Sequence, residues 1–455
     1  MNFFRSFTAP LGRLLTAFAA MALASGCAGM QDVSIMDMGA GTEAEDNAMA
    51  INQAIELCHE QGGGRVVVPK GRFQTGSLIL KAGVCLYLEE GAVLAASREL
   101  AAYASYETDK DMSRYDSGKG TANSNCVSDK NWCRALILSV KADGSSIKGK
   151  GLIDLGALRD PHGEEGLRGP HGIIVAETRN FKMSGVRIKD ASNYAILGYE
   201  LEDCCFKNLD IEGGWDGIHM RGGRNILISY CCFATGDDCL AGGYWKGLTV
   251  KGCDFNSSCN GIRMIMPSEG FTVRNCNFHG PGRRPYITSS ERAAREGGVY
   301  VPSMLHAIVI EPGAWGPAPG RLDGIRIEDS RAESVLSPFC LTLGEDNTCG
   351  KLIISGYKAT GASPLALSAK SWGTSRIGSV VIRKSSFSFA GDPEEGLSAK
   401  ILSLPYDRWP VFPSYGAYFR NVDSVLLDRV TFTALTPDSR PDILTDSVRV
   451  FRRRR

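Results

Sequence analysis

The sequence predicts an all-β fold, a single-stranded right-handed parallel β-helix (a solenoid) with an N-terminal capping helix. Two observations predict the solenoid. Apolar residues recur every 22 or 23 residues, and within each repeat they alternate with other residues, as at Ile226 and Ile228 and again at Leu248 and Val250. Alternation is the period of a strand, and a fixed repeat with no helical pattern is typical of stacked coils. The right hand is expected because parallel crossovers almost always have it.

Three ladders of residues follow this repeat through the middle of the chain. The first apolar ladder contains Met183, Phe206, Ile228, Val250 and Val273. The second apolar ladder contains Ile188, Ile211, Phe233, Phe255 and Phe278. The third ladder is polar and contains Asn193, Asp216, Asp238 and Asn260. If the coils stack in parallel, equivalent residues lie about 4.8 Å apart, so each ladder becomes a column of side chains.

Residues 1–26 are predicted to be a signal peptide of the lipoprotein type. They carry Arg5 and Arg13, then an apolar run that is too short to span a bilayer core of about 30 Å, and then small residues before Cys27. The Ala-Ser-Gly-Cys ending resembles a bacterial lipobox, so we expect Cys27 to be acylated; cleavage just past Ala28 is the alternative. The protein is then exported, as an outer-membrane lipoprotein or as a periplasmic or secreted protein, and contacts a membrane only through a lipid anchor.

Residues 28–455 are expected to form one β-helix domain whose first coil is covered by a helix. Ile51, Ile55 and Cys58 lie on one face of the predicted helix that follows Asn47. Asparagine is a favoured N-cap residue, so Asn47 is predicted to cap this helix. Such a helix is expected to cover the end of the solenoid, because an uncovered end exposes core side chains and unpaired strand edges. We expect an elongated, capped solenoid of this kind to be a monomer.

Composition excludes several classes of protein. The chain has 51 basic and 50 acidic residues and a formal charge of +1, so it lacks the basic excess that drives nucleic-acid binding. At 43% hydrophobic and 22% charged residues it is not of the disordered class. Its six histidines lack the spacing of metal ligands, and its glycine cluster lacks the rest of a phosphate-binding motif. Neither a metal nor another cofactor is expected.

The cysteines are predicted to have two uses. Disulfides are permitted in an exported chain, and Cys126 and Cys133 bracket a polar insertion, so these two are predicted to form a loop disulfide. Cys231, Cys253 and Cys276 recur at one position of the repeat, which predicts a stack of small apolar side chains in the core.

The polar ladder brings three carboxylates together. Asp216 and Asp238 are equivalent residues on consecutive coils, and Asp237 precedes Asp238 in the turn 235–239. Close acids repel one another, which costs stability unless the cluster has a task. Glycoside hydrolysis needs one acid that protonates the leaving oxygen and another that activates water, and close carboxylates separate their pKa values. A solvated structural ladder is the alternative interpretation.

These residues resemble the polygalacturonases, glycoside hydrolase family 28, over nearly all of the mature chain. The N-terminal match includes the segments AINQAI at 50–55, GGG at 62–64 and VVVPKG at 66–71. The family's Gly-Asp-Asp motif is intact and ends in Asp237 and Asp238, and its Asn-Thr-Asp motif keeps only Asp216. The resemblance implies a right-handed parallel β-helix and metal-free, inverting hydrolysis. It assigns the acid role to Asp237 and the water-activating role to Asp216 and Asp238.

Two family motifs are altered. The Gly-His-Gly motif falls on Cys259-Asn260-Gly261, so its histidine is missing, and the Arg-Ile-Lys motif has no clean match. Arg263, one coil earlier, is a candidate replacement, and His306 and Glu311 are candidates for the neighbouring face. In polygalacturonases the basic pair grips a uronate carboxylate, so these changes indicate a different sugar at the cleavage site.

Five residues are therefore candidate substrate contacts: Arg263, Asn260, His219, His306 and Trp215. His219 is on the coil of Asp216 and is a candidate for the missing orienting histidine, with a turn histidine bonded to backbone as the alternative. The Trp215 ring is a candidate platform for a sugar, with packing over the coil below as the alternative.

The leading hypothesis is a glycosidase that acts on a pectin-like or other acidic polysaccharide or oligosaccharide, including rhamnose-containing ones. The first alternative is a polysaccharide lyase or epimerase on the same fold. The second is a non-catalytic, glycan-binding solenoid, because the fold by itself supports all three functions.

Overall fold

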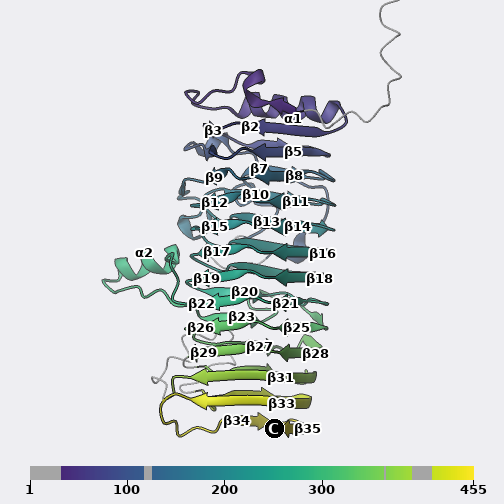
Figure 1. Cartoon of the computed structure of the whole chain (residues 1–455), viewed down its shortest axis with the longest axis vertical. Helices are drawn as coiled ribbons and strands as arrows, with labels where there is room; N and C mark the ends of the chain where they lie inside the picture. The colour runs from purple at the N-terminus through teal and green to yellow at the C-terminus, as the bar shows by residue number, and fades with distance from the viewer. Residues whose placement is uncertain (1–31, 117–124, 363–364, 392–411) are drawn as a thin grey trace, which may run out of the picture.

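The computed structural model describes residues 32–116, 125–362, 365–391 and 412–455. These residues form the predicted parallel β-helix, in which the strands lie one above another along the whole molecule (Figure 1). Two α-helices accompany the strands, α1 (Ala48–Glu60) and α2 (Ile287–Arg295). The predicted signal peptide and Cys27 lie outside the described residues.

Three stacks of parallel strands form the walls of the solenoid. The first stack contains β4 (Leu78–Leu80), β7 (Ala135–Val140), β10 (His171–Ala176), β13 (Ile196–Glu202), β16 (Ile218–Ser229), β18 (Leu240–Lys251), β20 (Asn260–Met264), β23 (His306–Ile310), β27 (Cys340–Leu343), β30 (Leu367–Ser371), β32 (Ala417–Arg420) and β34 (Ile443–Asp446).

The second stack begins with the most N-terminal strand described and contains β1 (Asp32–Ser34), β2 (Gly64–Val68), β5 (Val84–Leu88), β8 (Ser146–Gly149), β11 (Lys182–Ser184), β14 (Cys205–Lys207), β21 (Thr272–Arg274), β24 (Gly320–Leu322), β25 (Ile325–Glu328), β28 (Asn347–Ser355), β31 (Ile377–Phe389), β33 (Val422–Ala434) and β35 (Val450–Arg454). The third stack contains β3 (Gly71–Thr75), β6 (Ala92–Ala96), β9 (Leu152–Asp154), β12 (Arg187–Lys189), β15 (Asp210–Glu212), β17 (Cys232–Thr235), β19 (Asp254–Ser257), β22 (Asn277–His279), β26 (Arg331–Glu333) and β29 (Lys358–Ala362). Four long strands, β16, β18, β31 and β33, continue from one stack into the next.

The strand register confirms the two apolar ladders. Met183 pairs with Phe206, and Phe206 pairs with Ile228 on the next coil. In the second ladder the Phe233, Phe255 and Phe278 rings stack with centroids 5.0 and 4.8 Å apart. All of these side chains are buried, so the core is a set of continuous columns inside the coil.

At one corner of the coil, a single residue with a left-handed backbone conformation recurs from coil to coil. Asn208 (φ 52°), Tyr230 (φ 55°), Gly252 (φ 64°) and Asn275 (φ 52°) occupy it on four consecutive coils. The backbone N–H of each donates to the residue before the equivalent corner on the next coil, as from Tyr230 to Lys251 at 2.9 Å. Glycine and asparagine tolerate this conformation, which explains why they punctuate the repeat.

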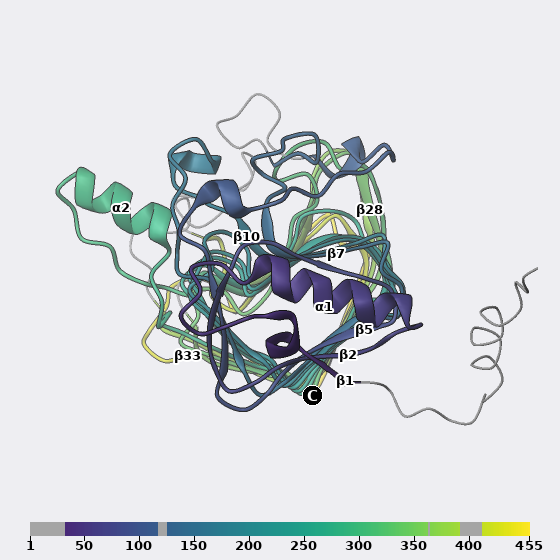
Figure 2. The ribbon, with the colours of Figure 1, turned by 90° about the horizontal axis from the view of Figure 1, so that it is seen from above.

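Helix α1 covers the first coil, as predicted, and packs against β2, β4 and β5 (Figure 2). Its apolar face, which includes Ile51, Ile55 and Cys58, is buried. The prediction that the Asn47 side chain caps the helix is wrong. That amide donates to the Gln74 carbonyl at 2.9 Å and accepts from a loop N–H, while Asp46 accepts from the Ala48 N–H at 2.8 Å.

The cysteines follow only one of the two predictions. Cys231, Cys253 and Cys276 are buried free thiols on successive coils, as the repeat predicts. Cys126 and Cys133 are not joined: the Cys133 thiol instead donates to the Val127 carbonyl at 3.4 Å. The tight loop thus satisfies the thiol locally. Among the described residues no helix is both long and apolar enough to cross a bilayer.

Candidate active site

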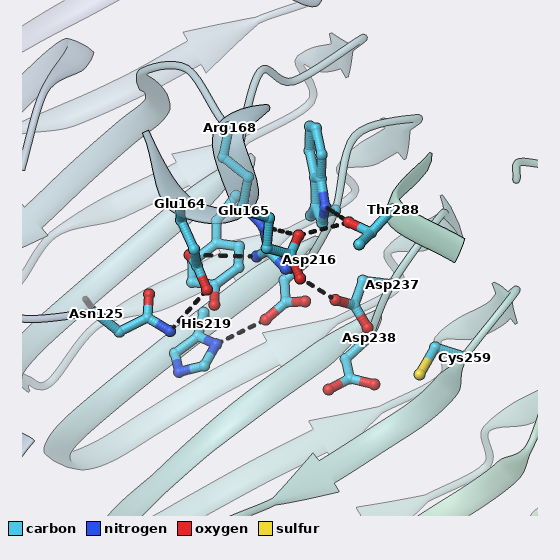
Figure 3. A network of polar contacts seen from close by, with 12 residues as sticks. Asn125, Glu164, Glu165, Arg168, Asp216, His219, Asp237, Asp238, Cys259 and Thr288 are labelled. Atoms are coloured by element: carbon cyan, nitrogen blue, oxygen red, sulfur yellow. Dashed lines mark hydrogen bonds and ion pairs between the residues drawn. The ribbon is translucent and has the colours of Figure 1, made fainter. Parts of the chain in front are cut away.

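The three predicted acids lie together because consecutive coils turn at the same point. Asp216 lies between β15 and β16, and Asp238 occupies the equivalent turn one coil later. The Gly217 N–H donates to the Asp238 carbonyl at 2.9 Å, which holds the two turns one strand spacing apart. Figure 3 shows Asp216, Asp237 and Asp238 pointing into one region.

The turn that carries Asp237 is crowded on both sides. The Asp237 N–H donates to the Trp215 carbonyl of the previous coil at 3.1 Å. A Cβ atom on Gly236 would lie 2.5 Å from the carbonyl oxygens of both Gly214 and Pro285. Only glycine fits this close approach, so packing requires a glycine directly before Asp237.

A cavity of about 140 Å³ opens over these acids. Its floor comes from the coils and its walls come from segments inserted between strands: the loop that contains Asn125, the hairpin that contains η4 (Glu164–Gly166) and Arg168, the arm before α2, and the loop that contains Trp315. Helix α2 projects outward from the coil, and its first turn contacts the coil, where Trp215 Nε1 donates to Thr288 Oγ1 at 3.0 Å (Figure 2). The cavity is lined by Asn125, Glu164, Arg168, Tyr194, Asp216, His219, Arg221, Asp237, Asp238, Ala241, Cys259, Arg263, Ile265, Tyr286 and Trp315.

Asp216 is held by a relay of buried side chains. His219 Nδ1 lies 2.7 Å from Asp216 Oδ2, and Arg221 Nε donates to His219 Nε2 at 3.2 Å. Because the guanidinium can only donate, Nε2 is the acceptor and the ring proton is on Nδ1, where it is donated to Asp216. Burial and the Arg221 charge lower the pKa of His219 well below its usual range, so the ring is neutral. Its face stacks on the Tyr194 ring at 4.7 Å.

Asp238 has an equivalent relay on the next coils. Asn260 Nδ2 donates to Asp238 Oδ1 at 2.7 Å, and His306 Nδ1 donates to Asn260 Oδ1 at 2.8 Å. Arg263 NH1 lies 3.9 Å from Asp238 Oδ2. Burial, with a smaller contribution from the Asp237 charge, raises the pKa of Asp238 to about 7.

Asp237 faces the cavity with a weaker set of partners. Arg168 NH2 lies 3.7 Å from Asp237 Oδ2, a contact longer than a hydrogen bond. Burial raises the pKa of Asp237, and burial together with the Asp237 and Asp238 charges raises the pKa of Asp216 well above its usual range. The cluster therefore holds protons at a pH where separate aspartates are ionised.

The structure places the predicted substrate contacts in three ways. Arg263 and His219 line the cavity. Asn260 and His306 are buried beside Asp238 and are not among the residues that line the cavity. Trp215 is only 2% exposed, and Arg168 lies over its ring at 5.2 Å; the expectation that this ring forms a sugar platform is therefore wrong, because neighbouring segments cover it.

Several cavity residues were not predicted from the sequence. Arg168 and Glu164 lie in an inserted segment that obeys no repeat, so no spacing placed them near the acids. The position of Tyr194 could have been predicted, since this residue directly follows Asn193 of the polar ladder. Asp237, Asp238 and Cys259 have potential ligand atoms within 4.8 Å of one another, but Asp238 already accepts the Asn260 hydrogen bond.

Comparisons with known proteins give the fold type. Residues 171–296 match the family model described as right handed beta helix region. A polygalacturonase of Ralstonia solanacearum is 35% identical over 261 residues, which are 45% of this chain and 46% of that protein. The chain thus spans about half the length of that relative.

Two solved structures are similar over most of the chain. The family 28 exopolygalacturonase of Yersinia enterocolitica has a TM-score of 0.61 at 14% identity and covers 94% of this chain and 78% of its own. The exopolygalacturonase of Thermotoga maritima has a TM-score of 0.58 at 16% identity, with 79% and 87% covered. At these identities the structures show the fold. Together the comparisons confirm the predicted resemblance: the chain is a polygalacturonase-like, right-handed parallel β-helix.

Proposed function

We propose that the protein is a glycoside hydrolase that cleaves a glycosidic bond in a pectin-like polysaccharide or oligosaccharide. One observation carries the proposal: three carboxylates from adjacent coils meet in a cavity whose burial raises their pKa values. The similarity to a polygalacturonase supports the substrate class.

Hydrogen bonding supports separate roles for the three acids. Asp216 and Asp238 each accept an N–H hydrogen bond of 2.7 Å, which favours their carboxylate forms. The Arg168 contact to Asp237 is longer, and two neighbouring negative charges favour the protonated form of the third acid. Asp237 is therefore the acid that protonates the leaving oxygen.

The two remaining acids activate water. In their carboxylate forms, Asp216 and Asp238 accept a proton from a water molecule as its oxygen attacks the anomeric carbon. The glycosidic bond breaks as Asp237 gives its proton to the departing sugar oxygen, so one proton is donated and one is taken up in each turnover. Attack by water without a covalent intermediate is inverting hydrolysis, as the resemblance implies.

Asp237→Asn tests the proposal directly. Release of reducing sugar from pectic fractions should fall about a hundred- to ten-thousand-fold, because the amide cannot donate the required proton, while the melting temperature stays close to that of the wild type. Asp210→Asn, on the exposed outer face, is the matched control and should keep full activity.

Two results would contradict the proposal. An unsaturated product that absorbs in the ultraviolet would indicate a lyase. Binding of polysaccharide without any release of reducing sugar by the wild-type protein would indicate a glycan-binding solenoid.

A further inference from the structure

The cationic side chains of the cavity are already engaged by the protein. Three arginines line it, Arg168, Arg221 and Arg263, and no lysine is among the residues that do. A sugar carboxylate entering the cavity would need at least one of these guanidinium groups. The partners of each arginine therefore decide whether the site accepts an acidic or an uncharged sugar.

Arg263 is bound by the acidic side chain of Glu311 and lies beside the Trp315 ring. Its Nε and NH2 atoms donate to Glu311 Oε1 at 2.8 and 2.7 Å, and its NH1 faces Asp238 at 3.9 Å. The Trp315 ring lies 5.4 Å from the guanidinium carbon. Glu311 directly follows β23, the strand that pairs with the strand of Arg263, so the neutralising charge is built into the coil.

Three carboxyl groups lie close to the Arg168 guanidinium. Glu165 Oε2 lies 3.0 Å from its Nε, Glu164 Oε2 lies 3.6 Å from its NH1, and Asp237 lies 3.7 Å from its NH2. The Trp215 and Tyr194 rings lie 5.2 and 5.8 Å from the guanidinium carbon. Its charge is thus shared among carboxylates of the same hairpin and turn.

Arg221 is engaged by neutral groups. Its NH1 donates to the Tyr115 and Asn125 carbonyls at 2.7 and 2.9 Å, and its Nε donates to His219. It is 1% exposed, so protein groups enclose almost all of this side chain.

Acidic side chains outnumber basic ones around the cavity. Six carboxyl groups lie beside the three arginines: Glu164, Glu165, Asp216, Asp237, Asp238 and Glu311. A further carboxylate in this low-dielectric cavity would be repelled, since like charges there are weakly screened.

We propose that the sugar ring seated in the cavity is uncharged, so that the protein selects a neutral or esterified sugar and rejects a hexuronate at this position. The inference rests on the proposed function for the identity of the site. The proposed sugar differs from galacturonate, the sugar that the name of the similar protein, polygalacturonase, indicates. In a pectic polymer, a neutral backbone or branch residue, or a methyl-esterified one, meets this requirement.

Binding of four monosaccharides to the full chain tests the proposal without any hydrolysis. Galactose, galacturonate and methyl galacturonate share one ring and differ only at C6, and rhamnose adds a second neutral ring. By calorimetry, at least one neutral sugar should bind, and galacturonate should bind at least about tenfold more weakly than methyl galacturonate. Galacturonate binding as tightly as its ester, or no binding by any neutral sugar, would overturn the inference.

A variant that removes the acidic partner of Arg263 makes the test sharper. Glu311→Gln removes the charge that neutralises Arg263 and should raise the affinity for galacturonate about tenfold while leaving that for galactose nearly unchanged. Glu328→Gln, which breaks the exposed ion pair with Arg274 outside the cavity, is the matched control and should change neither. Equal affinities of wild type and Glu311→Gln for galacturonate would contradict the charge argument.

The outcomes separate this inference from the proposed function. If Asp237→Asn keeps full activity while the binding preference holds, the catalytic assignment is wrong and the charge selection stands. If Asp237→Asn is inactive while galacturonate binds tightly, the assignment stands and the selection is wrong.

Discussion

The three cavity acids differ in how the protein holds their charges, and Asp238 gives the clearest pH dependence. Its pKa is raised by burial from 3.8 to about 7, so the folded state keeps a proton that the unfolded state loses above pH 4. Protons bound only by the folded state stabilise it. This contribution is complete below pH 4 and is lost as the pH rises through 7.

Asp238→Asn should remove this dependence. The variant is uncharged at every pH and its side-chain oxygen can still accept from Asn260, so its melting temperature should exceed that of the wild type by a few degrees at pH 8 and by little at pH 4. Thermal unfolding followed by circular dichroism measures both. Asp210→Asn, on the exposed outer face, should keep the wild-type slope; an unchanged slope in Asp238→Asn would show that burial does not raise this pKa.

His219 is expected to act through Asp216, by lowering the pKa of that carboxyl group, and not through a contact with the substrate. His219→Ala removes the Nδ1–H donor, which raises the pKa of Asp216 and moves the acid limb of the kcat/KM profile to higher pH, with a rate loss of about ten- to a hundredfold at pH 5. His219→Gln, whose amide can donate to the same oxygen, should restore part of the limb. A uniform loss of rate with no movement of the limb would mean that the histidine only fills space.

At the scale of elements, the left-handed corner predicts a stabilising substitution. Tyr230 adopts φ 55° on a corner where the next coil has Gly252, and its side chain is half exposed. Tyr230→Gly should raise the free energy of unfolding by up to about 1 kcal/mol, because a left-handed tyrosine costs more than the extra chain entropy of glycine. Lys207→Gly, in β14 just before the equivalent corner, should instead lower it. Urea denaturation distinguishes the two, and a less stable Tyr230→Gly would contradict the corner argument.

Elements that follow the repeat were predictable, and inserted elements were not. The Phe233 and Phe255 column and the Asp216 and Asp238 turn follow from spacing alone, since backbone pairing between coils fixes which residues meet. The hairpin of Arg168 contacts the coil through the Asp237 side chain and follows no repeat, so no periodicity indicates its position. Asn47 failed as a cap for a similar reason: Gln74, distant in sequence, takes its amide.

At the scale of the whole molecule, each coil is stabilised by its two neighbours, and the first coil depends on α1. Ile55→Asp places a charge in the apolar contact between α1 and the coil. A core Ile→Ala change costs about 2–5 kcal/mol, and the buried charge should destabilise the N-terminal coils by more than that. Size-exclusion chromatography should then show association through the uncovered coil.

The same helix supplies the control for this prediction. Met49 is 76% exposed, so Met49→Asp should elute and melt like the wild type. A monomeric, stable Ile55→Asp would mean that the coils below α1 do not need the helix.

The hydrogen bond from Gly217 to the Asp238 carbonyl has a consequence for how such proteins diverge. The separation of Asp216 and Asp238 is set by the peptide backbone, at the spacing that neighbouring coils share, and not by the choice of side chains. Substitutions in the peripheral hairpins can thus change the walls of the cavity while this pair of aspartates keeps its spacing.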